Sequence, residues 1–157
     1  RGAGTINPHP PLGAMWKTES LFTAIAFGYD LEHLYLRLDP DEASQSKRQS
    51  LQIECQLHTP AHGYRLRVSL ASPDRYTLAR KQEDGTWQDL GSSHLIELNQ
   101  VLELALPFKD IHVEERQVLK LTILVFDNGL EIARYPHQQP AAVTVPGPDF
   151  EATVWRV

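Results

Sequence analysis

The sequence has little cysteine, little methionine and no excess of positive charge, and each shortage excludes a class of protein. Of 157 residues, only one is cysteine and only one is methionine. A disulfide scaffold and a cysteine-rich zinc site are therefore excluded. With 15 Lys and Arg against 20 Asp and Glu, the formal net charge is −5. The chain lacks the positive field that holds a polyanion, so we expect no nucleic-acid partner.

Long apolar runs are also missing. No stretch approaches the roughly 20 apolar residues that cross a bilayer, and residues 1–11 lack the apolar core of a signal peptide. We therefore expect no membrane partner and a cytoplasmic location. The composition, 41% hydrophobic and 22% charged, is typical of a globular domain large enough to bury a core.

The pattern that dominates the chain is alternation of apolar and polar residues. A period of two predicts strands with one buried and one solvated face. Residues 119–126 are nearly all apolar, which predicts a strand buried on both faces. Gly85 and the pair Asn128-Gly129 predict tight turns between paired strands. The alternating segments are residues 34–38, 51–57, 64–70 and 102–106.

These strands predict an all-β fold. No window of helical length has apolar residues at helical spacing, so we expect helix only in short turns such as residues 108–112. About eight to ten short strands favour a two-layer antiparallel β-sandwich, of jelly-roll or immunoglobulin-like type, over a barrel. We expect residues 1–12 to be an irregular lead-in, with a flexible Gly2-Ala3-Gly4, and residues 138–148 to be irregular. Residues 13–157 then form a single domain.

The polar residues give no pattern of a catalytic or metal site. Acidic residues such as Glu54, Glu97 and Glu103 fall on the polar positions of strands, which predicts a solvated face. His58 and His62 are four residues apart across a turn, and we interpret them as two loop histidines and not as a ligand pair. Cys55 falls on an apolar position and is interpreted as core packing. We therefore predict no metal, no cofactor and no catalysis by this chain.

Aromatic residues give the one candidate binding site. Sugars have apolar C–H faces rimmed by hydroxyl groups, so their sites combine an aromatic platform with a few fixed polar groups. The alternative for each tryptophan is packing in a core or between domains. The candidate ligand-binding residues are Trp16, Trp87, Tyr35 and Arg37, with Arg65, Arg67, Asp39 and Gln88 as further hydrogen-bonding groups and Trp155 as a further platform.

Three segments carry a resemblance to known domains. They are residues 13–15 (GAM), residues 27–39 (FGYDLEHLYLRLD) and residues 101–108 (VLELALPF). Residues 13–15 followed by residues 27–39 resemble the opening of the C-terminal β-sandwich domain of some glycoside hydrolase family 57 proteins. In shape the chain also resembles family 9 carbohydrate-binding modules and DOMON-like domains, in which a segment like residues 101–108 closes a sheet. The resemblance implies a noncatalytic accessory domain that binds or presents an α-glucan, and an upstream catalytic barrel as a further partner.

Two alternatives stay open. The first is a purely structural module that docks on a catalytic barrel, with Trp155 packed between domains. The second is a DOMON-like haem-binding domain, for which Met15 would be the methionine ligand.

Overall fold

The computed structural model describes residues 2–8 and 21–149, and nearly all the regular secondary structure within them is strand. Five strands form one sheet in the order β1-β2-β3-β9-β8. The other sheet has seven strands, in the order β11-β10-β4-β5-β6-β7 with β12 beside β10. We call them the five-stranded and seven-stranded sheets. All strand pairs are antiparallel.

The element bounds are as follows. The five-stranded sheet contains β1 (Gly2–Ile6), β2 (Phe22–Tyr29), β3 (His33–Pro40), β8 (Ile96–Leu98) and β9 (Leu102–Pro107). The seven-stranded sheet contains β4 (Leu51–His58), β5 (Gly63–Ser69), β6 (Tyr76–Lys81), β7 (Trp87–Ser93), β10 (Val118–Asp127), β11 (Leu130–Tyr135) and β12 (Ala141–Thr144). Two short helices, α1 (Glu42–Ser46) and the 3-10 helix η1 (Phe108–Ile111), connect strands.

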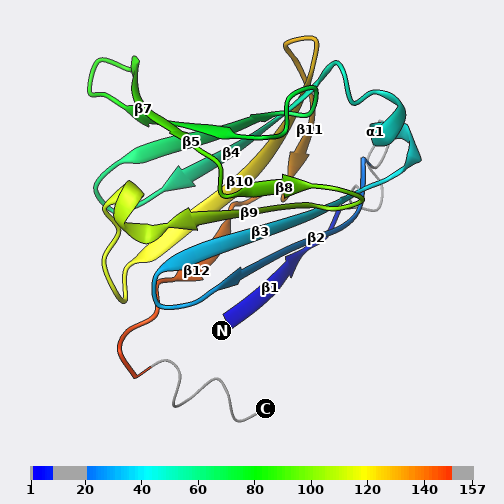
Figure 1. Ribbon diagram of the computed structural model, residues 1–157. Coiled ribbons are helices and arrows are strands. Elements are labelled where there is room, and N and C mark those ends of the chain that lie inside the picture. The colour runs from blue at the N-terminus through cyan, green and yellow to red at the C-terminus, as the bar shows by residue number, and fades with distance from the viewer. Residues whose placement is uncertain (1, 9–20, 150–157) are drawn as a thin grey trace.

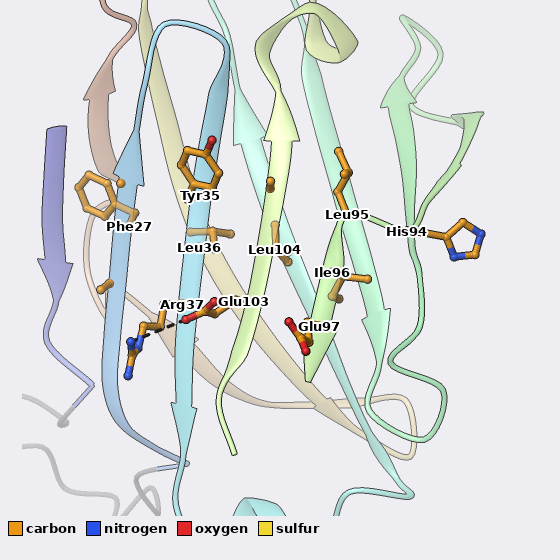
Figure 2. Close-up of a pocket in the computed structure, with 13 residues that line it drawn as sticks. Phe27, Tyr35, Leu36, Arg37, His94, Leu95, Ile96, Glu97, Glu103 and Leu104 are labelled. Atoms are coloured by element: carbon orange, nitrogen blue, oxygen red, sulfur yellow. Dashed lines mark ion pairs between the residues drawn. The ribbon is translucent and has the colours of Figure 1, made fainter. Parts of the chain in front are cut away.

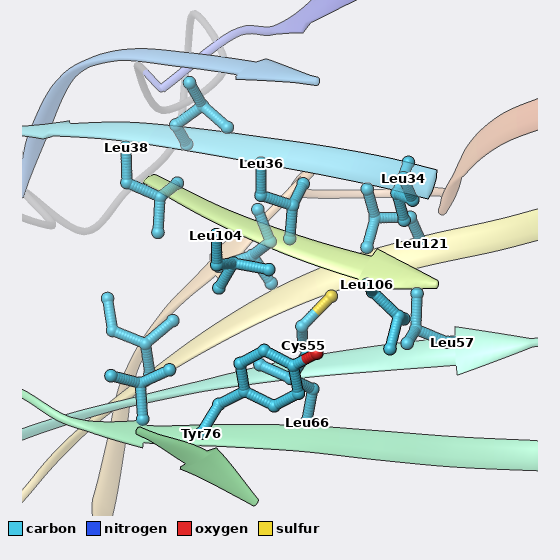
Figure 3. Close-up of a cluster of buried hydrophobic side chains, with 14 of the residues drawn as sticks. Leu34, Leu36, Leu38, Cys55, Leu57, Leu66, Tyr76, Leu104, Leu106 and Leu121 are labelled. Atoms are coloured by element: carbon cyan, nitrogen blue, oxygen red, sulfur yellow. The ribbon is translucent and has the colours of Figure 1, made fainter. Parts of the chain in front are cut away.

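The two sheets pack face to face as a β-sandwich, which confirms the predicted all-β, two-layer fold (Figure 1). The apolar positions of the alternating strands meet in one buried cluster (Figure 3). Cys55 lies in this cluster and is 1% exposed. Burial raises the pKa of its thiol, and the neighbouring Glu54 raises it further. The interpretation of Cys55 as core packing agrees with this environment. The Tyr76 hydroxyl donates to the carbonyl oxygen of Ala105 at 2.9 Å and so ties β6 to β9 across the core.

The predicted turns are confirmed, and the strand predicted to be buried on both faces over residues 119–126 is so over residues 121–125, whereas Lys120 is exposed. Thr122 and Leu124, on the polar side of β10, are only 6% and 2% exposed. Asn128 and Gly129 both have positive φ, at 48° and 84°. Those angles are typical of the primed turn that joins twisted strands. The short turn expected near residue 108 is the helix η1.

Some segments expected to be irregular are strands. Gly2–Ile6 is strand β1, paired with β2, and Ala141–Thr144 is strand β12. The flexible lead-in predicted for Gly2-Ala3-Gly4 is therefore wrong. A Cβ on Gly4 would fall 2.4 Å from Cζ of Phe27, so the glycine leaves room for that ring over the edge strand. Gly2 and Gly4 are needed in β1 because the rings of Tyr29 and Phe27 occupy the space that a side chain would fill.

Candidate functional site

The five-stranded sheet carries an open groove on its outer face, built from two rows of residues that cross the strands. Because side chains alternate along each strand, residues directly opposite one another share a face. One row contains Ala26, Arg37, Glu103 and Glu97, and the other contains Gly28, Tyr35 and Ala105, followed by Leu95. The first row is charged and the second is small or apolar.

The groove has a volume of about 560 Å³, within the range of small-molecule sites. Ala26, Gly28 and Ala105 supply small side chains, so larger groups define the edges of the groove. Figure 2 shows Tyr35 toward one end and the Arg37 and Glu103 pair toward the other. Leu95 and His94, at the crossover between the sheets, close the side near β8. A flat aromatic ring and charged hydrogen-bonding groups thus flank the same space.

The Tyr35 ring is held by a hydrogen bond to Asp30. The Tyr35 hydroxyl donates to Oδ2 of Asp30 at 2.6 Å, and Oδ1 accepts from the backbone N–H groups of Glu32 and His33 at 2.8 and 2.7 Å. Burial raises the pKa of Asp30, but the three hydrogen bonds outweigh it and leave the pKa below its ordinary value. The carboxylate is therefore ionised at neutral pH and orients Tyr35.

The charged row is cationic at its centre and acidic on the β8 side. Nε of Arg37 donates to Oδ1 of Asp39 at 3.0 Å, and Nη1 lies 3.7 Å from Oε1 of Glu103. The hydrogen bond to Asp39, more than the charge of Glu103, raises the pKa of Arg37. A ligand in the groove thus meets both hydrogen-bond donors and carboxylate acceptors.

Glu97 and Glu103 lie directly opposite each other on β8 and β9. The Glu103 side chain is 60% exposed, and its Oε1 lies 3.7 Å from Nη1 of Arg37. The pair therefore places carboxyl oxygens at the open face of the groove, where they can accept hydrogen bonds from a ligand.

The sequence-predicted site residues do not all come together. Tyr35 and Arg37 line the groove, whereas Trp87 lies half-buried on β7 of the other sheet. The guanidinium of Arg65 covers one face of the Trp87 ring, with Cζ 4.4 Å from its centroid. The predictions for Trp16, Met15 and Trp155 fall outside the described residues.

Sequence reasoning missed the groove residues on β8 and β9. Glu97 and Glu103 were interpreted as a solvated face, which is correct for their exposure but gives no hint that Glu103 lies opposite Arg37 on β3 and Glu97 opposite Glu103. Across residues 2–8 and 21–149, no three His, Cys, Asp or Glu side chains are grouped to hold a metal ion. Within the same part of the chain, no helix has the length and apolar character to cross a membrane.

Comparison with known proteins finds no matching family model, no matching curated protein and no matching solved structure. The resemblance to family 57 accessory domains therefore stays a prediction. Any functional conclusion depends on the geometry of the sandwich itself.

Proposed function

We propose that this β-sandwich is a noncatalytic carbohydrate-binding domain of a carbohydrate-active protein, and that it binds a neutral α-glucan in the groove of the five-stranded sheet. The observation that carries the proposal is the pair of rows across that sheet, one charged and one small or apolar.

A sugar ring has the two kinds of surface that these rows match. Its C–H face fits against Tyr35 and the small residues Gly28 and Ala105, where a large side chain would block the approach. Its hydroxyl groups fit between the guanidinium of Arg37 and the carboxylate of Glu103, which donate and accept hydrogen bonds. A row of four residues across neighbouring strands spans roughly 14 Å, so the groove suits an oligosaccharide lying across the strands.

The domain binds without cleaving. Glu97 and Glu103 are exposed, and in this proposal their carboxyl oxygens accept hydrogen bonds from the glucan hydroxyl groups. The remainder of a longer protein would supply the chemistry, and this domain would keep the glucan near it.

Calorimetric titration with maltohexaose tests the proposal. We expect binding by the unchanged chain, a loss of about tenfold or more in affinity for Tyr35→Ala and Arg37→Gln, and no change for Arg75→Gln, whose side chain lies in the loop between β5 and β6. Tyr35→Phe keeps the ring and removes the hydroxyl, so it separates stacking from the hydrogen bond to Asp30. Trp16→Ala tests the remaining predicted platform.

Absence of binding by the unchanged chain would favour the alternative of a structural docking module. Release of shorter sugars from maltohexaose, abolished in Glu97→Gln or Glu103→Gln, would contradict the noncatalytic part of the proposal.

A further inference from the structure

A second surface, on the outer face of the seven-stranded sheet, presents a guanidinium group held against an aromatic ring. Cζ of Arg65 lies 4.4 Å from the centroid of Trp87. No hydrogen bond or ion pair from the described residues engages this guanidinium. Its N–H donors are therefore oriented by stacking while their hydrogen-bonding capacity stays available to a ligand.

The strand register explains how Arg65 reaches Trp87. Arg65 on β5 lies opposite Ala79 on β6, and Trp87 on β7 lies opposite Lys81. Two strand spacings, roughly 10 Å, separate β5 from β7. To reach Trp87 the Arg65 side chain has to cross β6, and its direct neighbour on that strand is Ala79, whose side chain is a single methyl group. A large residue at this position would block the contact.

Arg65 forms no ion pair with an acidic side chain of the described residues, although the charge of Glu54 acts on it at longer range. Its neighbour on the same face, Arg67, has Nε 2.6 Å from Oε1 of Glu54. The other oxygen of Glu54 accepts from Nε2 of Gln56 at 3.0 Å. Glu54 is 3% exposed, so its carboxylate is fully engaged by these partners. Burial and the charge of Arg67 lower the pKa of Arg65, and the charge of Glu54 offsets part of that effect, but a guanidinium stays charged at neutral pH. A ligand carboxylate or sulfate would relieve the repulsion between the arginines.

We propose that Arg65 and Trp87 form a second binding site, which takes the carboxylate or sulfate group of an acidic glycan. The oxyanion accepts hydrogen bonds from Arg65, and the sugar ring lies beside the indole edge of Trp87. Nucleic acid fits this surface less well, because a phosphate chain needs an extended positive track, whereas the chain has net charge −5 and Arg67 is compensated by Glu54.

Titration of the full chain with four hexamers in low salt tests this site: hexagalacturonate, sulfated maltohexaose, maltohexaose and a thymidine hexanucleotide. We expect at least one acidic sugar to bind, and the better of the two identifies the anionic group. We expect Arg65→Gln and Trp87→Leu each to weaken that binding about tenfold or more. Arg75→Gln, a change of the same charge, leaves it unchanged, and urea unfolding verifies that each variant is folded.

Three results would overturn the second site. The first is no binding of either acidic sugar. The second is a loss of affinity in Arg75→Gln equal to the loss in Arg65→Gln. The third is tighter binding of the oligonucleotide than of both acidic sugars. The test is independent of the groove, because Tyr35→Ala should weaken maltohexaose binding and leave hexagalacturonate binding unaffected. Arg65→Gln should leave maltohexaose binding unaffected and weaken the binding of the acidic sugar.

Discussion

Asp30 is a positioning residue for the groove, because one carboxylate closes the turn between β2 and β3 and also orients Tyr35. Its Oδ1 accepts from two backbone N–H groups, and its Oδ2 accepts from the Tyr35 hydroxyl. The turn and the ring are therefore coupled through a single ionised group. Protonation of this group weakens both contacts together.

The stability contributed by Asp30 should depend on pH. A carboxyl group whose pKa is lower in the folded chain stabilises the fold above its unfolded pKa, and that stabilisation is lost as the pH falls through the folded pKa. The pKa of Asp30 is below its ordinary value of 3.8. Asp30→Asn keeps an acceptor for the turn and removes the charge, so we expect it to lose about 1 kcal/mol of unfolding free energy at pH 7.

Urea unfolding of both proteins between pH 7 and pH 2 measures this difference. It should be constant down to about pH 4 and should shrink below that value. Asp74→Asn, in the exposed loop between β5 and β6, is the matched control and should show little effect. A difference for Asp30→Asn that stays constant down to pH 2 would contradict this account of the carboxylate.

At the scale of elements, β4 and β5 are joined by a buried charge as well as by backbone pairing. Glu54 and Arg67 lie opposite each other in the register, and the Glu54 side chain is 4% exposed while that of Arg67 is 36% exposed. The Arg67 side chain therefore covers Glu54. Removing the cation alone would leave a buried carboxylate without a compensating charge, which is strongly destabilising.

Arg67→Met should lower the unfolding free energy by about 2–3 kcal/mol at pH 7. Adding Glu54→Gln to Arg67→Met should recover part of that loss, because the buried charge is then gone. Arg75→Met removes an exposed arginine and serves as the control, with an expected loss below about 1 kcal/mol. Urea unfolding at pH 7 measures the unfolding free energy of the unchanged chain and of each of these variants. Equal losses for Arg67→Met and Arg75→Met would show that Glu54 does not depend on Arg67.

The elements that could be predicted from the sequence are those with a local signal. Alternation in β3, β4, β5 and β9 depends on the residues of each strand alone, and the turn at Asn128-Gly129 depends on two residues that tolerate positive φ. Strand β1 was not predicted because glycines at this spacing are also typical of a flexible segment. Their role becomes visible only when Phe27 and Tyr29, on the paired strand, occupy the space that a side chain would fill.

At the scale of the molecule, the site was less predictable than the fold. Tyr35 and Arg37 were predicted as ligand-binding residues and lie in the groove, but whether they bind a sugar remains a prediction. Their neighbours Glu103 and Ala105 come from β9, far along the chain, and only the pairing of β3 with β9 brings them together. No local pattern encodes that pairing. The same holds for Arg65 and Trp87, which meet across an intervening strand.

The sandwich thus presents two outer faces with different chemistry. The five-stranded sheet offers a groove with mixed donors and acceptors, and the seven-stranded sheet offers a guanidinium stacked on an indole, with no ion pair to it from the described residues. Binding at the groove is the central claim, and backbone amide shifts from ¹⁵N-labelled protein during a maltohexaose titration test it most directly. We predict that the largest shifts fall on Ala26, Tyr35, Arg37, Glu103 and Ala105, with little change across β5, β6 and β7. Shifts confined to the seven-stranded sheet, or none at saturating sugar, would contradict it.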